Sequence, residues 1–419
     1  MSIFPSLVFF IVCLTVYSPL SKTLLTLAGQ SNYTSTLRDL LLISLGLYGI
    51  VRANPLQSPR LLWGVVILLG SIFFYIAISA YEDQYLPGLY YARFYALPVF
   101  FMMALAGSLY EATPRDKDSL IKATLWLNLV TVIVSIVLYG VMLADKGLAS
   151  KLIVGSEDAV LLADSWYISG GTWMRMGLPA TSPNNLGLIL ALNLYFCTVA
   201  ARRVDGILKR MLPYAIALTF LALLLTFSRS SVLLYLVALA LLLVFKDIHI
   251  PARTWGWAGT VGAIVLATGI AGIVAVNPDI ADNVSHWIEL NLSGDDPSMQ
   301  GHIKTFKEAW ERLPEYYLHG FEKGTVGPNA IFFTLSINHV ENTILGVIYD
   351  MGFFLGFFFL LGWGLTLSHF HQQRRQYAAF WGFFVCSQFL PYFFGADALI
   401  VFAYLYALSG LMHDSRVST

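Results

Sequence analysis

Long apolar stretches separated by short polar segments repeat along the whole chain. A helix that crosses a bilayer needs roughly 17–25 mainly apolar residues, and the pattern predicts about twelve such helices. The chain is therefore expected to be an all-α polytopic membrane protein. The predicted spans begin near Phe4, Thr36, Leu61, Tyr91, Ile121, Asn185, Met211, Ser230, Trp255, Glu341, Gln376 and Asp397.

One apolar stretch, from Met211 to Phe245, contains a single arginine, Arg229, with a serine on either side. At ~1.5 Å per residue a straight helix of this length would measure about 52 Å, whereas the bilayer core is about 30 Å thick. The stretch therefore predicts two short helices that meet at residues 227–230, where serines suit a turn or a helix cap. Because a charge at the bilayer centre costs several kcal/mol, Arg229 is expected in this hairpin, near one membrane face.

The basic residues set the expected orientation, since short cytoplasmic loops are rich in Lys and Arg. Fourteen of the 25 Lys and Arg residues fall in short segments that all lie on the same side when the chain crosses the membrane at each predicted span. That side is expected to be cytoplasmic, and it also holds both termini. The opposite face receives two long loops and the Arg229 hairpin. These fourteen residues are Arg52, Arg60, Arg115, Lys117, Lys122, Arg202, Arg203, Lys209, Arg210, Lys246, Arg253, Arg374, Arg375 and Arg416.

The predicted organisation has five consecutive segments and no separate soluble domain. They are residues 1–143 with spans one to five, 144–184 with the first outer loop, 185–276 with spans six to nine, 277–340 with the larger outer loop, and 341–419 with the last three spans and a short cytoplasmic tail. The first apolar stretch has no basic segment before it and no convincing cleavage site, and is expected to be a retained span.

Composition agrees with the membrane class and excludes others. Hydrophobic residues make up 57% of the chain and charged residues 12%, against about 25% charged in soluble domains. The net charge of zero gives no sign of a nucleic-acid partner. The three cysteines lie far apart in apolar segments, and no cluster has metal-ligand spacing. No metal, nucleotide motif or other cofactor is expected.

Within the larger outer loop, apolar residues recur at helical spacing, which predicts an amphipathic helix that ends at Pro314. We expect this helix to lie along the membrane surface; the alternatives are a cap on the helix bundle or a direct role in substrate binding. The apolar residues are Ile303, Phe306, Ala309, Trp310 and Leu313.

Two arginines on the predicted outer face are candidates for phosphate binding. Arg175 lies in a glycine-containing segment before the span that opens with Asn184, and Arg229 follows Ser228 in the hairpin. Guanidinium groups donate paired hydrogen bonds to phosphate oxygens, so the pair is expected to bind a phosphate or diphosphate, supported by Ser228 and Asn184. The alternative is that each arginine anchors a helix end at the membrane surface.

A second polar group lies where the larger loop re-enters the membrane, at His339, Glu341 and Asn342. Burial can tune the pKa of Glu341 or His339 for general base catalysis; the alternative is a polar helix start whose side chains bind first-turn amides. Asp350 is expected to pair inside the bundle. His302, beside glycine-marked turns, is a third candidate base.

Several of these motifs resemble the O-antigen polymerase and ligase superfamily. They are the hairpin Thr226-Phe-Ser-Arg-Ser230, the Arg175 segment that leads into Pro183-Asn-Asn-Leu-Gly187, and the re-entry at Glu341-Asn342 followed by Gly352 and Gly356. The resemblance covers about residues 170–356. It implies a metal-independent glycosyltransferase of the GT-C type in the bacterial inner membrane, which uses undecaprenyl-diphosphate-linked glycan on the periplasmic side.

The resemblance also implies roles for the candidate residues. Arg175 and Arg229 would stabilise the leaving diphosphate, and a base would deprotonate the acceptor sugar. Ligases usually have a His-Asn pair at the re-entry, but this chain has Glu341-Asn342; His302 replaces an arginine common before the loop helix. Both departures favour a polymerase and leave the base open between Glu341, His339 and His302.

The expected function is polymerisation of lipid-linked oligosaccharide repeat units. The expected partners are the undecaprenyl-diphosphate-linked donor and acceptor glycans and the lipid bilayer, and the resemblance allows for a chain-length regulator. The alternatives are a ligase that transfers glycan to the lipid A core and, from another class, a transporter or flippase. The scarcity of acidic and basic residues deep in the spans argues against a transporter.

Overall fold

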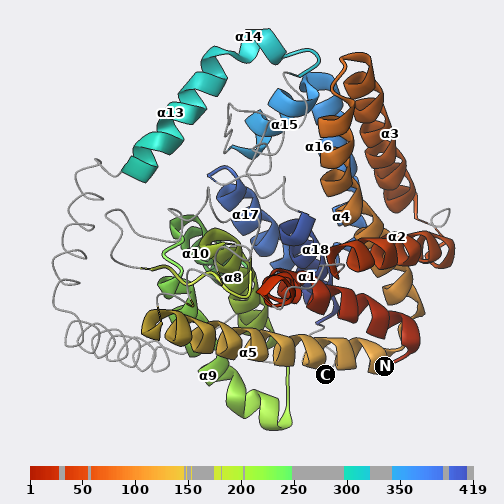
Figure 1. The fold of residues 1–419 in the computed structure, drawn as a ribbon. Helices are drawn as coiled ribbons and strands as arrows, with labels where there is room; N and C mark the ends of the chain where they lie inside the picture. The colour runs from red at the N-terminus through yellow and green to blue at the C-terminus, as the bar shows by residue number, and fades with distance from the viewer. Residues whose placement is uncertain are drawn as a thin grey trace. The chain divides into compact units, whose positions relative to one another are not determined.

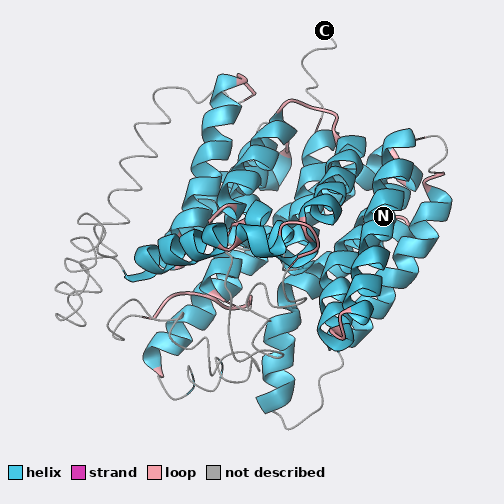
Figure 2. Ribbon diagram, turned by 90° about the horizontal axis from the view of Figure 1, so that it is seen from above, coloured by secondary structure: helices cyan, strands magenta, loops and turns pink. Residues whose placement is uncertain are grey.

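The computed structural model of the chain consists of helices, and the residues that it describes contain no β-strand (Figures 1 and 2). The described residues are 1–27, 34–54, 58–145, 148, 152, 174–180, 182–201, 203–247, 297–320, 342–389 and 396–412. Seven of their helices are long and apolar enough to cross a membrane. This is consistent with the predicted polytopic membrane protein.

The helices of the first half are α1 (Ile3–Leu27), α2 (Thr34–Arg52), α3 (Pro59–Tyr81), α4 (Tyr85–Glu111), α5 (Pro114–Ala144), α8 (Pro183–Ala200), α9 (Gly206–Leu225) and α10 (Arg229–Val244). Those of the second half are α13 (Pro297–Glu311), α14 (Leu313–Tyr316), α15 (Thr343–Met351), α16 (Phe353–Phe370), α17 (Arg375–Ser387) and α18 (Ala396–Leu411). The span predicted to begin near Trp255 lies outside the described residues.

The helices form two compact units. Unit 1 comprises residues 1–18, 33–125 and 302–419, and unit 2 comprises residues 19–32 and 126–301. Helices α2, α3, α4 and α14–α18 lie in unit 1, whereas α8, α9 and α10 lie in unit 2.

Small residues allow the helices of unit 1 to approach closely. A Cβ on Gly46 of α2 would come within 2.6 Å of the Phe100 carbonyl oxygen of α4, and one on Gly107 of α4 would meet the backbone of Gly49. Between α3 and α16, Gly64 and Gly362 make a similar contact. Such small-residue contacts are typical of helices packed in membranes, where close backbone approach increases van der Waals contact.

The predicted break inside the apolar stretch 211–245 is confirmed. Helix α9 ends at Leu225 and α10 begins at Arg229. Between them Phe227 has a positive φ of 51°, a conformation that a helix cannot contain. In unit 2, α8 packs against both α9 and α10.

The span predicted to begin near Glu341 is not one helix, which corrects the sequence analysis. Helix α15 ends at Met351, and α16 begins at Phe353. Gly352 between them has a φ of +79°, which glycine adopts readily because it has no Cβ. The membrane-length helix is therefore α16, and α15 is a separate helix of nine residues.

Candidate functional site

Arg175 lies in an extended segment of unit 2 and bridges two other parts of that unit. Its Nε donates to the backbone carbonyl oxygen of Thr226 at 2.9 Å, and its Nη2 donates to Oδ1 of Asn184 at 2.8 Å. The guanidinium group thus joins the turn between α9 and α10 to the first turn of α8. The side chain is half-buried.

Backbone contacts fix the segment that carries Arg175. The amide of Met176 donates to the Leu225 carbonyl at 3.0 Å, and the Tyr139 hydroxyl donates to the Met174 carbonyl at 2.9 Å. Met174 and Leu178 are also buried in a small apolar cluster with residues of α5. Arg175 is therefore presented from a segment that is anchored on both sides of it.

The turn between α9 and α10 is held by its own hydroxyl groups. The hydroxyls of Ser228 and Ser231 lie 2.7 Å apart, and the Thr226 hydroxyl donates to the Leu223 carbonyl at 2.7 Å. Thr226, Ser228 and Ser231 are all buried. Buried hydroxyls need hydrogen-bond partners. In this turn they find those partners within the turn itself and at the end of α9, so polar residues are tolerated between two apolar helices.

Helix α8 approaches this turn closely at Gly187. A Cβ at that position would lie 2.8 Å from Cβ of Ser228 and 2.8 Å from Oγ of Ser231. Contacts this short are tighter than real side chains allow, so the approach depends on glycine. The first turn of α8 and the first turn of α10 are consequently held close to each other.

Two helix N-termini therefore meet beside Arg175. At the start of α8, Ser182 accepts a hydrogen bond from the amide of Asn185 at 3.2 Å. At the start of α10, Ser228 makes no side-chain capping bond. Helix N-termini carry partial positive charge and N–H groups that bind anions. The arrangement concentrates positive potential at one place in unit 2.

Arg229 is the first residue of α10 and is exposed. It lies three residues after Thr226, whose carbonyl binds Arg175. The structure thus brings the two predicted arginines to one turn although 53 residues separate them along the chain. Their exposure differs: Arg175 is half-buried and bonded to Thr226 and Asn184, whereas Arg229 is exposed.

Of the predicted supporting residues, Asn184 binds Arg175 and Ser228 lies in the turn before α10; their predicted role in phosphate binding stays a prediction. The sequence analysis did not single out the Thr226 carbonyl or Gly187, although both stood in the quoted motifs. The signals that identify them are a threonine directly after the apolar helix α9 and a glycine near the start of α8.

The re-entry residues are placed only in part. Asn342 caps α15, accepting a hydrogen bond from the Leu345 amide at 3.0 Å. The Thr343 hydroxyl donates to the Ser387 carbonyl of α17 at 2.6 Å. Glu341 and His339 lie outside the described residues. His302 lies on α13, and its side chain is also outside the described part. The three candidate bases therefore stay predictions.

Asp350 pairs inside unit 1, as the sequence predicts. Its side chain is fully buried, and its carboxylate accepts hydrogen bonds from the hydroxyls of Tyr75 at 3.1 Å and of Tyr95. These tyrosines come from α3 and α4. The two hydroxyl donors satisfy the hydrogen-bonding needs of the buried carboxylate. The same contacts connect α15 to α3 and α4.

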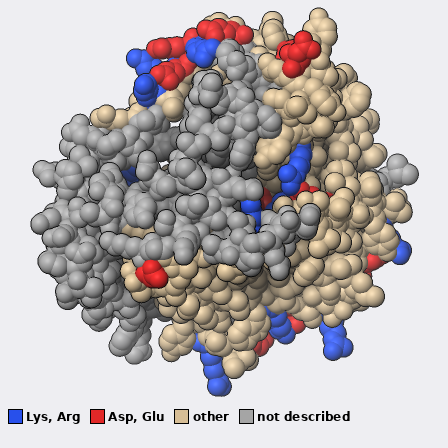
Figure 3. Space-filling model, viewed as in Figure 1, with Lys and Arg blue, Asp and Glu red and all other residues tan. Residues whose placement is uncertain are grey.

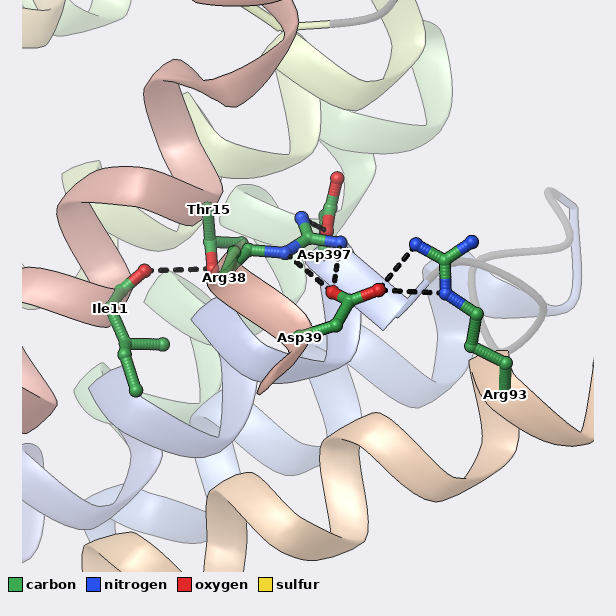
Figure 4. A network of polar contacts seen from close by, with 6 residues as sticks. All are labelled: Ile11, Thr15, Arg38, Asp39, Arg93 and Asp397. Atoms are coloured by element: carbon green, nitrogen blue, oxygen red, sulfur yellow. Dashed lines mark hydrogen bonds and ion pairs between the residues drawn. The ribbon is translucent and has the colours of Figure 1, made fainter. Parts of the chain in front are cut away.

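A partly buried ionic network in unit 1 was missed by the sequence analysis. Figure 4 shows the Asp39 carboxylate between the guanidinium groups of Arg38 and Arg93. Arg38 donates to Asp39 at 3.0 Å and to Asp397 at 2.6 Å, and Nε of Arg93 donates to Asp39 at 2.7 Å. Two positive and two negative side chains balance, so the network ties α2, α4 and α18 together without excess charge.

Within the residues for which the structure gives a placement, no group of three His, Cys, Asp or Glu side chains is arranged to hold a metal ion.

Comparison of the chain with protein-family models, with curated proteins and with solved structures gave no match.

Proposed function

We propose that this protein is a membrane glycosyltransferase that polymerises undecaprenyl-diphosphate-linked oligosaccharide repeat units at the periplasmic face of the bacterial inner membrane. One observation carries the proposal: Arg175 bridges the start of α8 and the turn that carries Arg229. Two arginines and two helix N-termini at one turn suit a diphosphate, which has several oxyanions to bind.

In the proposed reaction a hydroxyl oxygen of the acceptor sugar attacks the anomeric carbon of the donor glycan. The bond between that carbon and the diphosphate oxygen breaks, and the lipid diphosphate leaves with the electron pair. Arg229 binds the leaving oxyanion, while Arg175 supports the turn and contributes its charge. This is electrostatic stabilisation of a developing charge, typically the largest contribution to such catalysis.

The proton of the attacking hydroxyl passes to a base, for which Glu341, His339 and His302 are the candidates. Glu341 and His339 precede α15 along the chain, and His302 lies on α13.

The test is an assay with the purified protein and a lipid-diphosphate-linked repeat unit as the only substrate. We expect a ladder of products on a gel, and about a 100-fold or greater loss of rate in Arg229→Ala. Arg210→Ala is the matched control, because Arg210 is an exposed arginine on neighbouring α9 and is expected to leave the rate unchanged.

The other outcomes are equally informative. Product that forms only after lipid A core is added would identify a ligase. A ladder that persists in Arg229→Ala would reject the diphosphate site, and the absence of any product with both acceptors would reject the glycosyltransferase.

A further inference from the structure

Helix α13 exposes its largest apolar side chains. Ile303, Phe306 and Trp310 are 56%, 46% and 60% exposed, and their spacing places them on one face of the helix. Ala309, which lies on a different side, is only 4% exposed. The buried side of α13 is therefore not its aromatic face. This argues against the alternative in which the apolar residues cap the bundle.

The charged side chains lie on a further face and neutralise one another. Lys304 pairs with Glu308 and Lys307 pairs with Glu311, each at 3.8 Å. After the helix, Arg312 pairs with Glu315 at 3.0 Å. Three basic and three acidic residues give residues 303–316 no net charge. Figure 3 shows basic and acidic atoms side by side along this part of the surface.

The chain that follows α13 and α14 is attached to the start of α16. Tyr317, just after α14, stacks on Phe353 at the start of α16 with ring centroids 5.0 Å apart, and the Phe353 amide donates to the Tyr317 carbonyl at 2.7 Å. Beyond Phe353, α16 exposes Phe354, Phe357 and Phe358. On a helix long and apolar enough to span a membrane, such side chains face lipid.

Gly352 makes this connection sterically possible. A Cβ there would collide with the carbonyl group of Leu318, so a larger residue would push the end of α14 away from α16. In Figure 1, α14 (cyan) follows α13 and ends beside α15. The exposed surface of α13 is thus attached, through Tyr317, to the point where α16 begins.

We propose that the aromatic face of α13 docks into the membrane leaflet at the N-terminal end of α16, and that its partner is the headgroup region of zwitterionic lipid. The attachment to α16, a helix long and apolar enough to span a membrane, favours a lipid partner over a protein partner. Aromatic and aliphatic side chains on one helix face are typical of interfacial helices. Because residues 303–316 carry no net charge, burial of apolar surface drives the docking, and anionic lipid is not required.

The experiment uses the full-length protein in phosphatidylcholine nanodiscs, in a background whose three native cysteines are replaced by alanine. A nitroxide is attached to Trp310→Cys or, as the matched control, to the adjacent Glu311→Cys on the charged face. Electron paramagnetic resonance then measures how often each label collides with oxygen, which partitions into lipid, and with a water-soluble nickel chelate.

We expect the oxygen-to-nickel collision ratio to be high at Trp310→Cys and low at Glu311→Cys, with no change when anionic phosphatidylglycerol is added. Equal nickel access at both positions would place the face in water. Low access of both reagents at Trp310→Cys would place it against protein. A ratio that rises only with anionic lipid would reject the neutral-lipid assignment.

Should Trp310→Cys fail to fold, Phe306→Cys and Lys307→Cys provide an equivalent pair. The result does not depend on any enzymatic activity, so it tests the docking surface separately from the proposed reaction.

Discussion

At the residue scale, Arg175 and Arg229 have different surroundings, so replacing each is expected to lower the polymerisation rate to a different extent. Arg175 holds two acceptors with a planar group that donates in two directions, whereas Arg229 is exposed at the start of α10. Lysine keeps the charge but has no planar fork, so the exchange is not conservative where both directions are used.

We therefore expect Arg175→Lys to reduce the polymerisation rate more than Arg229→Lys, because lysine cannot bridge the Thr226 carbonyl and Asn184 together. Arg175→Ala should lower the rate by about 100-fold or more. Initial rates for the purified variants, compared at equal folded protein, measure the effect. Equal rates for both lysine variants would show that charge alone matters at Arg175.

At the scale of elements, the candidate site depends on how closely α8 approaches the turn before α10. The close approach occurs at Gly187, where no side chain fits between the helix and the serines of the turn. The site therefore requires a glycine at position 187 as well as the two arginines. Helix packing thus contributes to its geometry together with the extended segment that carries Arg175.

Gly187→Ala should force α8 away from the turn, with an expected loss of about 1–3 kcal/mol in unfolding free energy from overpacking. Gly140→Ala is the matched control, since a Cβ on Gly140 of α5 would meet nothing within 4 Å. Denaturant titration in mixed micelles measures both variants. Comparable stability of the two would contradict the close approach.

At the scale of the whole molecule, the charged groups divide into two kinds. The network of Arg38, Asp39, Arg93 and Asp397 balances its own charge and joins α2, α4 and α18 within unit 1. Buried ionic groups remain tolerable only while they stay paired. We infer a structural role for this network.

Asp39→Asn should therefore be strongly destabilising, by about 3–5 kcal/mol, because it leaves Arg38 and Arg93 with one carboxylate fewer between them. Asp118→Asn removes the acid of an exposed pair with Lys122, and the expected cost there is below about 1 kcal/mol. The same titration compares the two, and a small effect of Asp39→Asn would show that the network does not hold the helices together.

Much of the helical organisation could be predicted from the sequence alone. The membrane class, most helix positions and the break before Arg229 follow from hydrophobicity and from serine and arginine within an apolar stretch. These are local properties, because each helix satisfies its own backbone hydrogen bonds. The pairing of Asp350 was also predictable in kind, since a lone carboxylate in an apolar helix needs partners.

The partners themselves were decided only by the tertiary structure. Arg175 meets a carbonyl 51 residues away, and Arg38 meets an aspartate 359 residues away; no spacing rule along one chain connects such groups. The break at Gly352 was missed because glycine is common in membrane helices, and its close approach to Leu318 is a contact between residues far apart in the chain. Likewise, periodicity identified α13 as amphipathic, but only packing shows which face is buried, because burial depends on neighbours distant in the chain.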